Sequence, residues 1–217
     1  MANGCIQGSM SHRVDRPSTP LPAQYRRFVS RDEVNELPVR RYEGDVNLVE
    51  TREALERARE DLRSEPAAGW DTETRPSFRK GEWHPPALLQ VAGARTVHLL
   101  RLQRIDCAAA VREIFGAPSI VKAGISVADD LMQLGGTFPG LQAQAVVDLG
   151  VAARRAGLEQ TGLRNLAAIF LGFRLPKGAK TTNWAASRLS AQQIGYAATD
   201  AWACRELYLR FRELGMN

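Results

Sequence analysis

The stretch Ala67-Ala68-Gly69-Trp70-Asp71-Thr72-Glu73-Thr74 decides the fold of this chain. Small and apolar residues lead into two carboxylates spaced two apart, a pattern that predicts a buried strand with a polar end. Successive side chains of a strand point to opposite faces, so Asp71 and Glu73 share one face and Thr72 points to the other. Like charges on one face repel each other unless water or a cation lies between them. An exposed strand end with solvated acids is the simpler alternative.

Further strands and helices are predicted on both sides of this stretch. The expected strands are 46–50, 67–74, 87–91, 96–100 and 119–124. The expected helices are 51–62 with Thr51 as its N-cap, 106–115 capped by Asp106, 127–134, 145–156, 161–171 and 190–214. Strands that come first with one helix among them, followed by a run of helices, predict an α/β fold. We therefore expect a mixed sheet flanked by helices, with a helix-rich C-terminal half.

Composition limits the class of protein. The 217 residues are 44% hydrophobic and 24% charged, which is ordinary for a globular protein. No apolar stretch approaches the roughly 20 residues that span a bilayer, and the first residues lack the apolar run of a signal peptide. Three scattered cysteines fit neither a disulfide scaffold nor a zinc site. These features predict no membrane association and a cytoplasmic location, or a nuclear one in a eukaryote.

The first 44 residues differ from the rest of the chain. They hold several prolines and mixed charges that nearly cancel, with no sustained periodicity. We expect residues 1–44 to form an N-terminal arm without a core element, either disordered in part or docked on the domain. Residues 45–217 then form the folded domain.

A second group of acids opens the predicted helix 127–134. At about 100° per residue, Val127, Leu131 and Leu134 lie on one apolar face. Asp130 lies at the flank of that face and Asp129 on the far side, toward solvent. Asp130 can therefore reach another element, although an acid in the first turn also stabilises a helix through its dipole without any chemistry.

A third group lies in the last helix. Tyr196 and Asp200 are four residues apart, so the phenol and the carboxylate lie side by side on one face. An amphipathic helix with a tyrosine at its boundary is the alternative. Together, Asp71, Glu73, Asp130 and Asp200 are hard oxygen ligands of the kind that Mg²⁺ or Mn²⁺ prefers. Converging carboxylates of this kind can hold two ions about 3.5–4 Å apart for phosphoryl chemistry.

These motifs and their neighbours resemble the DEDDy 3′–5′ exonucleases, which include ribonuclease D and the Werner syndrome exonuclease domain. The resemblance covers roughly residues 45–215. It is carried by Trp70-Asp71-Thr72-Glu73, Pro76, Phe78 and Ala87-Leu88-Leu89-Gln90-Val91, by Val121-Lys122-Ala123-Gly124 with Asp130, and by Asn183-Trp184, Leu189, Ile194, Tyr196-Ala197-Ala198-Thr199-Asp200 and Tyr208. It implies a ribonuclease H-like fold.

The resemblance also implies roles for single residues. Asp71 would bridge two divalent cations, Mg²⁺ or Mn²⁺, with Glu73 and Asp200 completing the inner site. Asp130 would hold the second ion through water, and Tyr196 would orient or help to deprotonate the attacking water. In the sister DEDDh group a histidine takes that role, at the position that is Gly195 here.

The implied reaction is metal-dependent hydrolysis of terminal phosphodiester bonds at single-stranded 3′ ends, which releases nucleoside 5′-monophosphates. The partner is then DNA or RNA, and the sequence does not distinguish a DNA exonuclease from a ribonuclease that processes RNA or degrades short oligoribonucleotides. A non-catalytic nucleic-acid-binding module on the same fold is the alternative.

Basic residues gather just before the third motif. Residues 154–188 contain seven Lys or Arg and one acid, which predicts a basic surface beside the site. A solvated positive face is the alternative. The substrate contacts expected from the sequence are Thr72, Phe78, Arg174, Lys177, Lys180 and Trp184. Trp184 could stack on a base, although a tryptophan just before a helix is as often packed in the core. His98, inside an apolar strand, is predicted to be a core histidine.

Overall fold

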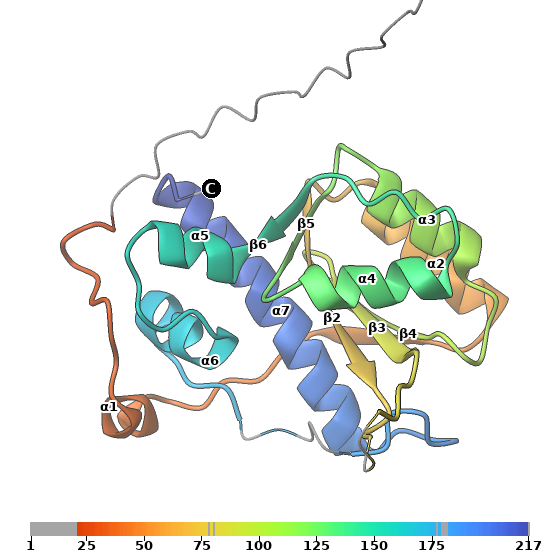
Figure 1. Cartoon of the computed structure of the whole chain (residues 1–217), viewed down its shortest axis with the longest axis horizontal. Helices are drawn as coiled ribbons and strands as arrows, with labels where there is room; N and C mark the ends of the chain where they lie inside the picture. The colour runs from red at the N-terminus through yellow and green to blue at the C-terminus, as the bar shows by residue number, and fades with distance from the viewer. Residues whose placement is uncertain (1–20, 78, 80, 177, 179–181, 217) are drawn as a thin grey trace, which may run out of the picture.

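A mixed sheet of six strands forms the centre of the protein (Figure 1). The computed structural model describes residues 21–77, 79, 81–176, 178 and 182–216. The strands are β1 Asp45–Val49, β2 Ala67–Thr74, β3 Pro86–Ala92, β4 Thr96–Arg101, β5 Val121–Gly124 and β6 Val146–Asp148, in the order β1-β4-β3-β2-β5-β6. β3 is antiparallel to both of its neighbours, whereas the other pairs are parallel. The predicted mixed sheet is confirmed.

Helices cover both faces of this sheet. They are α1 Arg31–Glu36, α2 Arg52–Arg63, α3 Ala108–Gly116, α4 Ala128–Thr137, α5 Leu149–Arg155, α6 Leu163–Leu166, the π-helical turn η1 Ala167–Leu171 and α7 Ala191–Glu213. Leu89 and Val91 of β3 pack with residues of α2 and α3, while Leu88 and Ala92 pack with α7. The alternation of β3 between two apolar faces explains why its sequence is an unbroken apolar run. No helix in the described part of the chain is long and apolar enough to cross a membrane.

The strand β6 was not predicted from the sequence pattern. It consists of only three residues, within the region expected to be the helix 145–156. β6 pairs in parallel with β5, with Ala123 opposite Val147. Three residues are too few for a period-2 pattern to be recognised, so this strand forms through its pairing with β5. It ends at Asp148, which becomes the N-cap of α5.

The long helix α7 lies unusually close to strand β2. A Cβ atom at Gly69 would lie 2.0 Å from the Ala201 carbonyl oxygen and 2.4 Å from the Arg205 backbone nitrogen. Glycine is therefore required where the helix crosses the strand. The small side chains of Ala197 and Ala198 are also buried in this contact region. The close approach brings the middle of α7 beside the polar end of β2.

The described part of the N-terminal segment begins at residue 21 and contacts the domain. Residues 21–44 dock on the domain and contain α1, in which Val34 is 8% exposed. Arg174 joins this segment to the domain through two backbone hydrogen bonds, donating to the Pro38 oxygen at 2.9 Å and accepting from the Arg40 nitrogen at 3.0 Å. Contacts with residues far along the chain hold this segment in place. Such contacts leave no periodic pattern in the local sequence.

Candidate active site

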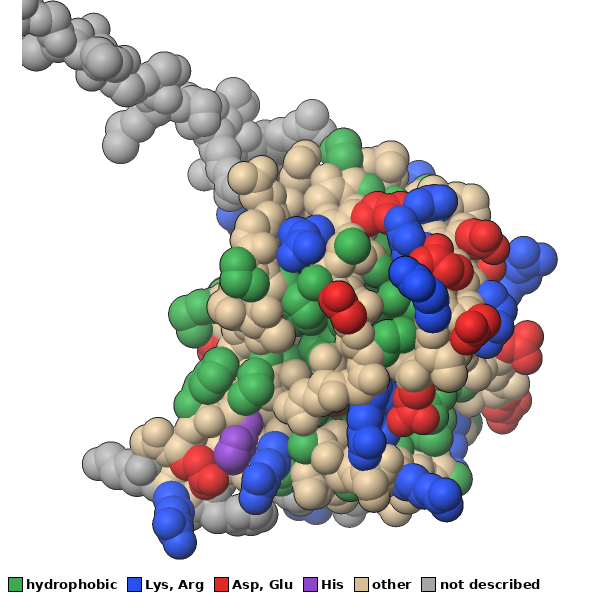
Figure 2. All heavy atoms as spheres, turned by 90° about the vertical axis from the view of Figure 1, so that its right-hand side faces the viewer, with side chains coloured by type: hydrophobic (Ala, Val, Ile, Leu, Met, Phe, Trp, Pro, Cys, Tyr) green, Lys and Arg blue, Asp and Glu red, His purple; other side chains and the backbone are tan. Residues whose placement is uncertain are grey.

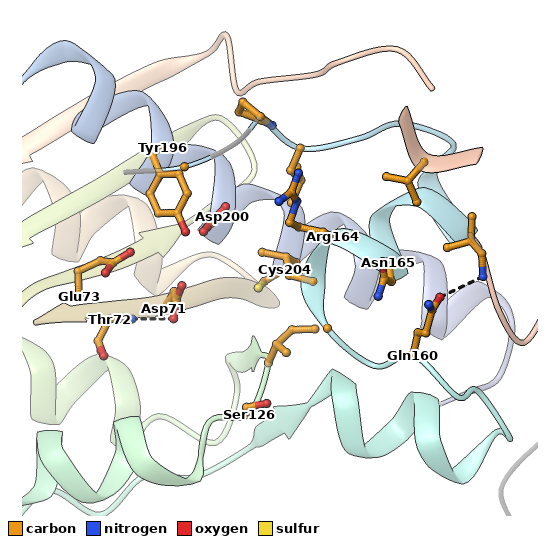
Figure 3. A pocket seen from close by; sticks show the side chains of 18 of the residues that line it. Asp71, Thr72, Glu73, Ser126, Gln160, Arg164, Asn165, Tyr196, Asp200 and Cys204 are labelled. Atoms are coloured by element: carbon orange, nitrogen blue, oxygen red, sulfur yellow. Dashed lines mark hydrogen bonds between the residues drawn. The ribbon is translucent and has the colours of Figure 1, made fainter. Parts of the chain in front are cut away.

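The four acids and the tyrosine singled out in the sequence line one cavity of about 940 Å³. Asp71 and Glu73 come from the end of β2, Asp130 from the first turn of α4, and Tyr196 and Asp200 from α7. Figure 3 shows Asp71, Glu73, Tyr196 and Asp200 gathered at one end of this cavity. Local spacing within each element set the orientation of these side chains, and the packing of the three elements brings them together.

Thr72 connects two of these elements. Its backbone nitrogen donates to Asp71 Oδ1 at 2.9 Å, and its hydroxyl donates to Asp130 Oδ1. The period-2 geometry of β2 explains this arrangement, because Thr72 points to the face covered by α4 while Asp71 points toward α7. Thr72 also lines the cavity, so its predicted substrate contact stays a prediction beside this observed contact with Asp130.

The helix α7 presents its phenol and carboxylate together. The Tyr196 phenol and the Asp200 carboxylate lie side by side in the cavity, as the spacing of four residues predicted (Figure 3). Asp200 is 8% exposed, so its carboxylate is held deep in the cavity wall. Burial, followed by the charges of Asp200, Glu73 and Asp71, raises the pKa of Tyr196 well above its ordinary value. These three carboxylates lie near the phenol at one end of the cavity (Figure 3).

Helix α4 orients Asp130 and Asp129 in opposite ways. Asp130 is half-buried and lines the cavity, whereas Asp129 is exposed, which confirms the prediction from helical phase. Burial is the main cause of the raised pKa of Asp130, and the hydrogen bond from Thr72 opposes it. The apolar face of the helix packs as expected, with Leu134 fully buried.

Asp148 is a fifth acid near the site, and no pattern in the sequence singled it out. Its carboxylate accepts hydrogen bonds from the backbone nitrogens of Ser126 at 3.3 Å, Val127 at 3.1 Å and Val151 at 3.1 Å. Ser126 has a φ of 56°, a left-handed conformation that is uncommon for serine. Asp148 therefore holds the turn from which α4 starts. An acid directly before a helix is the only sequence signal of this role.

The acids create a strongly negative region around Cys204, which is 2% exposed and lines the cavity. Burial, then the charges of Asp71, Asp200, Asp148 and Asp130, raise the pKa of the Cys204 thiol well above its ordinary value. This thiol is therefore a poor nucleophile. The same negative region attracts a cation.

The donor set has the chemistry that Mg²⁺ or Mn²⁺ requires, since all its members are carboxylates. Across the described part of the chain, however, no three His, Cys, Asp or Glu side chains already stand in an arrangement that would hold a metal ion. Carboxylates without a cation between them repel each other.

Of the two alternatives for Trp184, base stacking and core packing, the structure shows core packing. Trp184 has no exposed surface and packs beside Tyr196, with their ring centroids 6.1 Å apart. A side chain without exposed surface cannot stack on a base, so Trp184 supports the tyrosine from within the core.

Arg174, another expected substrate contact, does not line the cavity, and its Nε donates to the Leu37 carbonyl at 3.0 Å.

The other expected substrate contacts lie outside the described residues. They are Phe78, Lys177 and Lys180. Between the two lysines, Gly178 is described and lies against the Tyr196 ring, where a Cβ would come within 1.7 Å of a ring carbon. Gly178 therefore lies directly against the Tyr196 ring. His98 is 1% exposed in β4, which confirms the prediction of a core histidine.

Comparison with known proteins identifies the same region of the chain. The family model described as 3′-5′ exonuclease matches residues 46–215. The ribonuclease D of Gluconacetobacter diazotrophicus is 34% identical over 170 residues, which covers 76% of this chain and 42% of that protein. The DNA polymerase I of Aquifex aeolicus is 26% identical over 170 residues, 78% of this chain and 28% of the polymerase.

Solved structures show the same fold. The EXO domain of Aedes aegypti Nibbler superposes with a TM-score of 0.72 at 22% identity, covering 82% of this chain and 91% of that one. The RNase D of Escherichia coli superposes with a TM-score of 0.72 at 24% identity, covering 79% of this chain and 45% of that one. The chain spans 28%, 26% and 42% of the first three curated relatives that it matches.

Proposed function

The chain belongs to the 3′–5′ exonuclease family, and from this premise we propose that it hydrolyses the terminal phosphodiester bond of single-stranded DNA or RNA at the 3′ end, releasing nucleoside 5′-monophosphates. One observation carries the proposal. Four carboxylates and one phenol, which are dispersed over 130 positions of the sequence, line a single cavity. A module that only binds nucleic acid has no need of four like charges beside a phosphate backbone.

The four acids Asp71, Glu73, Asp130 and Asp200 would hold two divalent cations, Mg²⁺ or Mn²⁺. When bound, the ions would lower the pKa of the attacking water and neutralise the charge that develops on the leaving 3′-oxygen. Thr72 supports this site on both sides of β2, because its N–H and hydroxyl bond to Asp71 and Asp130. Its two hydrogen bonds orient carboxylates from two different elements relative to each other.

Tyr196 would orient the attacking water. Its hydroxyl lies beside Asp200 in the cavity, and a phenol can donate one hydrogen bond and accept another, so it can bind a water molecule. Gly178 and the buried ring of Trp184 both pack against the ring of Tyr196. With Gly195 at the position of the histidine of the sister group, this arrangement supports assignment to the tyrosine (DEDDy) branch.

The test is cleavage of 5′-labelled single strands in Mg²⁺ or Mn²⁺, with a chelator control. We expect a ladder of products shortened from the 3′ end. Asp71→Ala and Asp200→Ala should abolish cleavage while circular dichroism shows a retained fold, and Tyr196→Phe should slow turnover less than either. Full activity of either acid variant would refute the site, and an unchanged rate of Tyr196→Phe would remove the water-orienting role.

Asp129 and Asp130 offer a matched pair of variants. The two acids are neighbours in one helix turn, yet Asp130 lines the cavity and Asp129 does not. Asp130→Ala should remove most activity, whereas Asp129→Ala should retain it. The reverse result would assign the metal-binding role to Asp129 instead of Asp130. The absence of any ladder with the wild-type protein under either metal would favour the non-catalytic binding module.

The natural substrate is tested by a side-by-side time course. Matched DNA, RNA and short oligoribonucleotides share the phosphodiester that the acids would act on, so their relative rates measure recognition of the sugar and of strand length. A rate for short oligoribonucleotides far above the others would favour a role in degrading them. Equal rates on DNA and RNA would argue against discrimination at the 2′-hydroxyl.

A further inference from the structure

The cavity continues well beyond the acids. Its second end is lined by α1 of the docked N-terminal segment and by the residues around α6. The polar side chains at this end are Arg31, Asn35, Gln160, Arg164 and Asn165. Figure 3 shows Gln160 and Asn165 at the end of the cavity opposite Glu73 and Asp71, with Arg164 between the two groups. The two ends thus have opposite chemistry, acidic at one and basic with carboxamides at the other.

Hydrogen bonds between the N-terminal segment and the loop before α6 hold this second end of the cavity in place. Gln160 Oε1 accepts a hydrogen bond from the Val29 backbone nitrogen at 3.0 Å, and the Glu159 nitrogen donates to the Arg27 oxygen at 3.1 Å. These contacts join the N-terminal segment to the loop before α6 at two successive positions. α1 itself begins with a capping box formed by Ser30, which defines its start. The side chains of α1 therefore have a defined place in the cavity wall.

The two arginines of this wall are available for a ligand. Arg31 and Arg164 are exposed, and among the residues that the structure describes neither forms an ion pair. Other arginines are engaged: Arg205 pairs with Glu65 at 3.4 Å, and Arg174 holds the N-terminal segment. A guanidinium that faces a cavity without an acidic partner is suited to bind a phosphate.

On the face made by α2 and α3, basic side chains are mixed with acids. Figure 2 shows Lys or Arg and Asp or Glu side chains interspersed over the face made by α2 and α3. Arg59 and Arg63 there pair with Glu113, the second at 2.6 Å. That mixture of charge does not favour a phosphate backbone. The basic end of the cavity differs because its arginines have no such partners within the described chain.

We propose that the wall formed by Arg31, Arg164, Asn35, Gln160 and Asn165 binds the phosphodiester backbone of the substrate strand upstream of the 3′-terminal nucleotide. This inference rests on the proposed function, because it assumes that the 3′ end lies at the acids. The strand would run from the acids past the apolar side chains of Leu163 and Pro176 to the arginines. The N-terminal segment thereby becomes part of the substrate site.

Two variants and a matched control test this subsite. Arg31→Ala and Arg164→Ala each remove one cavity arginine, and both residues are exposed, so the fold should persist. Arg154→Ala is the control, because Arg154 is exposed on α5 in the same basic block but does not line the cavity. Binding of fluorescent DNA and RNA strands is measured in chelator at several salt concentrations, and KM and kcat are measured with Mg²⁺ or Mn²⁺.

We expect each cavity variant to raise the Kd and KM about three- to tenfold for strands longer than a dinucleotide, with kcat changed less than about twofold. The slope of log Kd against log salt should fall by about 0.7 for each phosphate that no longer pairs with an arginine. Arg154→Ala should change neither quantity. A difference between the DNA and RNA arms would show which strand the wall prefers.

The two proposals fail in different ways. If the wild-type protein cleaves strands and both cavity variants behave as Arg154→Ala does, the subsite is overturned and the function stands. If the wild-type protein binds strands through Arg31 and Arg164 but does not cleave them, the nuclease function is overturned and the subsite stands. A wild-type protein that neither binds nor cleaves would overturn both.

Discussion

Gly69→Ala tests the close contact between β2 and α7 that brings the acids together. A Cβ at this position would lie 2.0 Å from the Ala201 carbonyl oxygen, whereas ordinary contacts begin at 3.4 Å. The obstructing atoms belong to the backbone and cannot rotate away, so α7 must retreat from β2 by about 1 Å. Gly69 lies two residues before Asp71, and Ala201 directly follows Asp200, so the displacement occurs between the two acids.

The expected effect has two parts. Overpacking of this contact should lower the free energy of unfolding by about 1–3 kcal/mol. A shift of about 1 Å between groups that must converge on one phosphodiester should lower kcat about 100-fold. Stability is measured by urea unfolding followed by circular dichroism, and kcat by cleavage of a labelled strand at saturating substrate.

Gly136→Ala is the matched control. Gly136 lies in α4, and no atom would come within 4 Å of an added Cβ. This variant should gain about 0.4–1 kcal/mol of stability, because alanine restricts the unfolded chain, and should keep its turnover. The reasoning is refuted if Gly69→Ala unfolds within about 0.5 kcal/mol of the wild type and turns over at the same rate.

Three further predictions concern positions around the site and the core. Gly178→Ala places a Cβ 1.7 Å from the Tyr196 ring, so kcat should fall about tenfold. The free energy of unfolding in urea should change by less than about 0.5 kcal/mol. An equal loss of kcat in a variant of a distant exposed loop would contradict this reasoning. Asp148→Ala leaves three backbone N–H groups without their acceptor and should cost about 1–2 kcal/mol by thermal unfolding, with Asp148→Asn losing less because it keeps a carbonyl acceptor. Burial lowers the pKa of His98 from 6.5 to about 4. Between these pH values His98 is therefore protonated in the unfolded chain but neutral in the folded protein. Stability should therefore fall by up to about 3 kcal/mol as pH drops through this window, and a urea series in which His98→Gln shows the same pH dependence would refute the assignment.

Local geometry explains why the site acids could be predicted from the sequence. Asp71 and Glu73 share a face because a strand has a period of two, and Tyr196 and Asp200 share one because a helix repeats after about four residues. The same reasoning about helical phase selected Asp130. Each of these predictions concerns residues within one element, where backbone geometry alone orients the side chains.

Contacts between distant segments were not predictable in this way. Trp184 has an aromatic side chain beside the third motif, which left base stacking and core packing as alternatives, and tertiary packing buries it behind Tyr196. Asp148 acts on a turn 21 residues earlier in the chain. No periodicity marks such a contact, because its partners belong to different elements.

The sequence by itself determined the acids, the tyrosine, their faces and the class of fold, since these follow from spacing along the backbone. Only the tertiary structure decided that Thr72 connects β2 to α4, that Gly69 sets the separation of β2 and α7, and that residues before Asp45 line the cavity. The physical reason is that a cavity is formed by surfaces from separate elements. Its shape and charge depend on how closely those elements pack, and packing is a property of the whole chain.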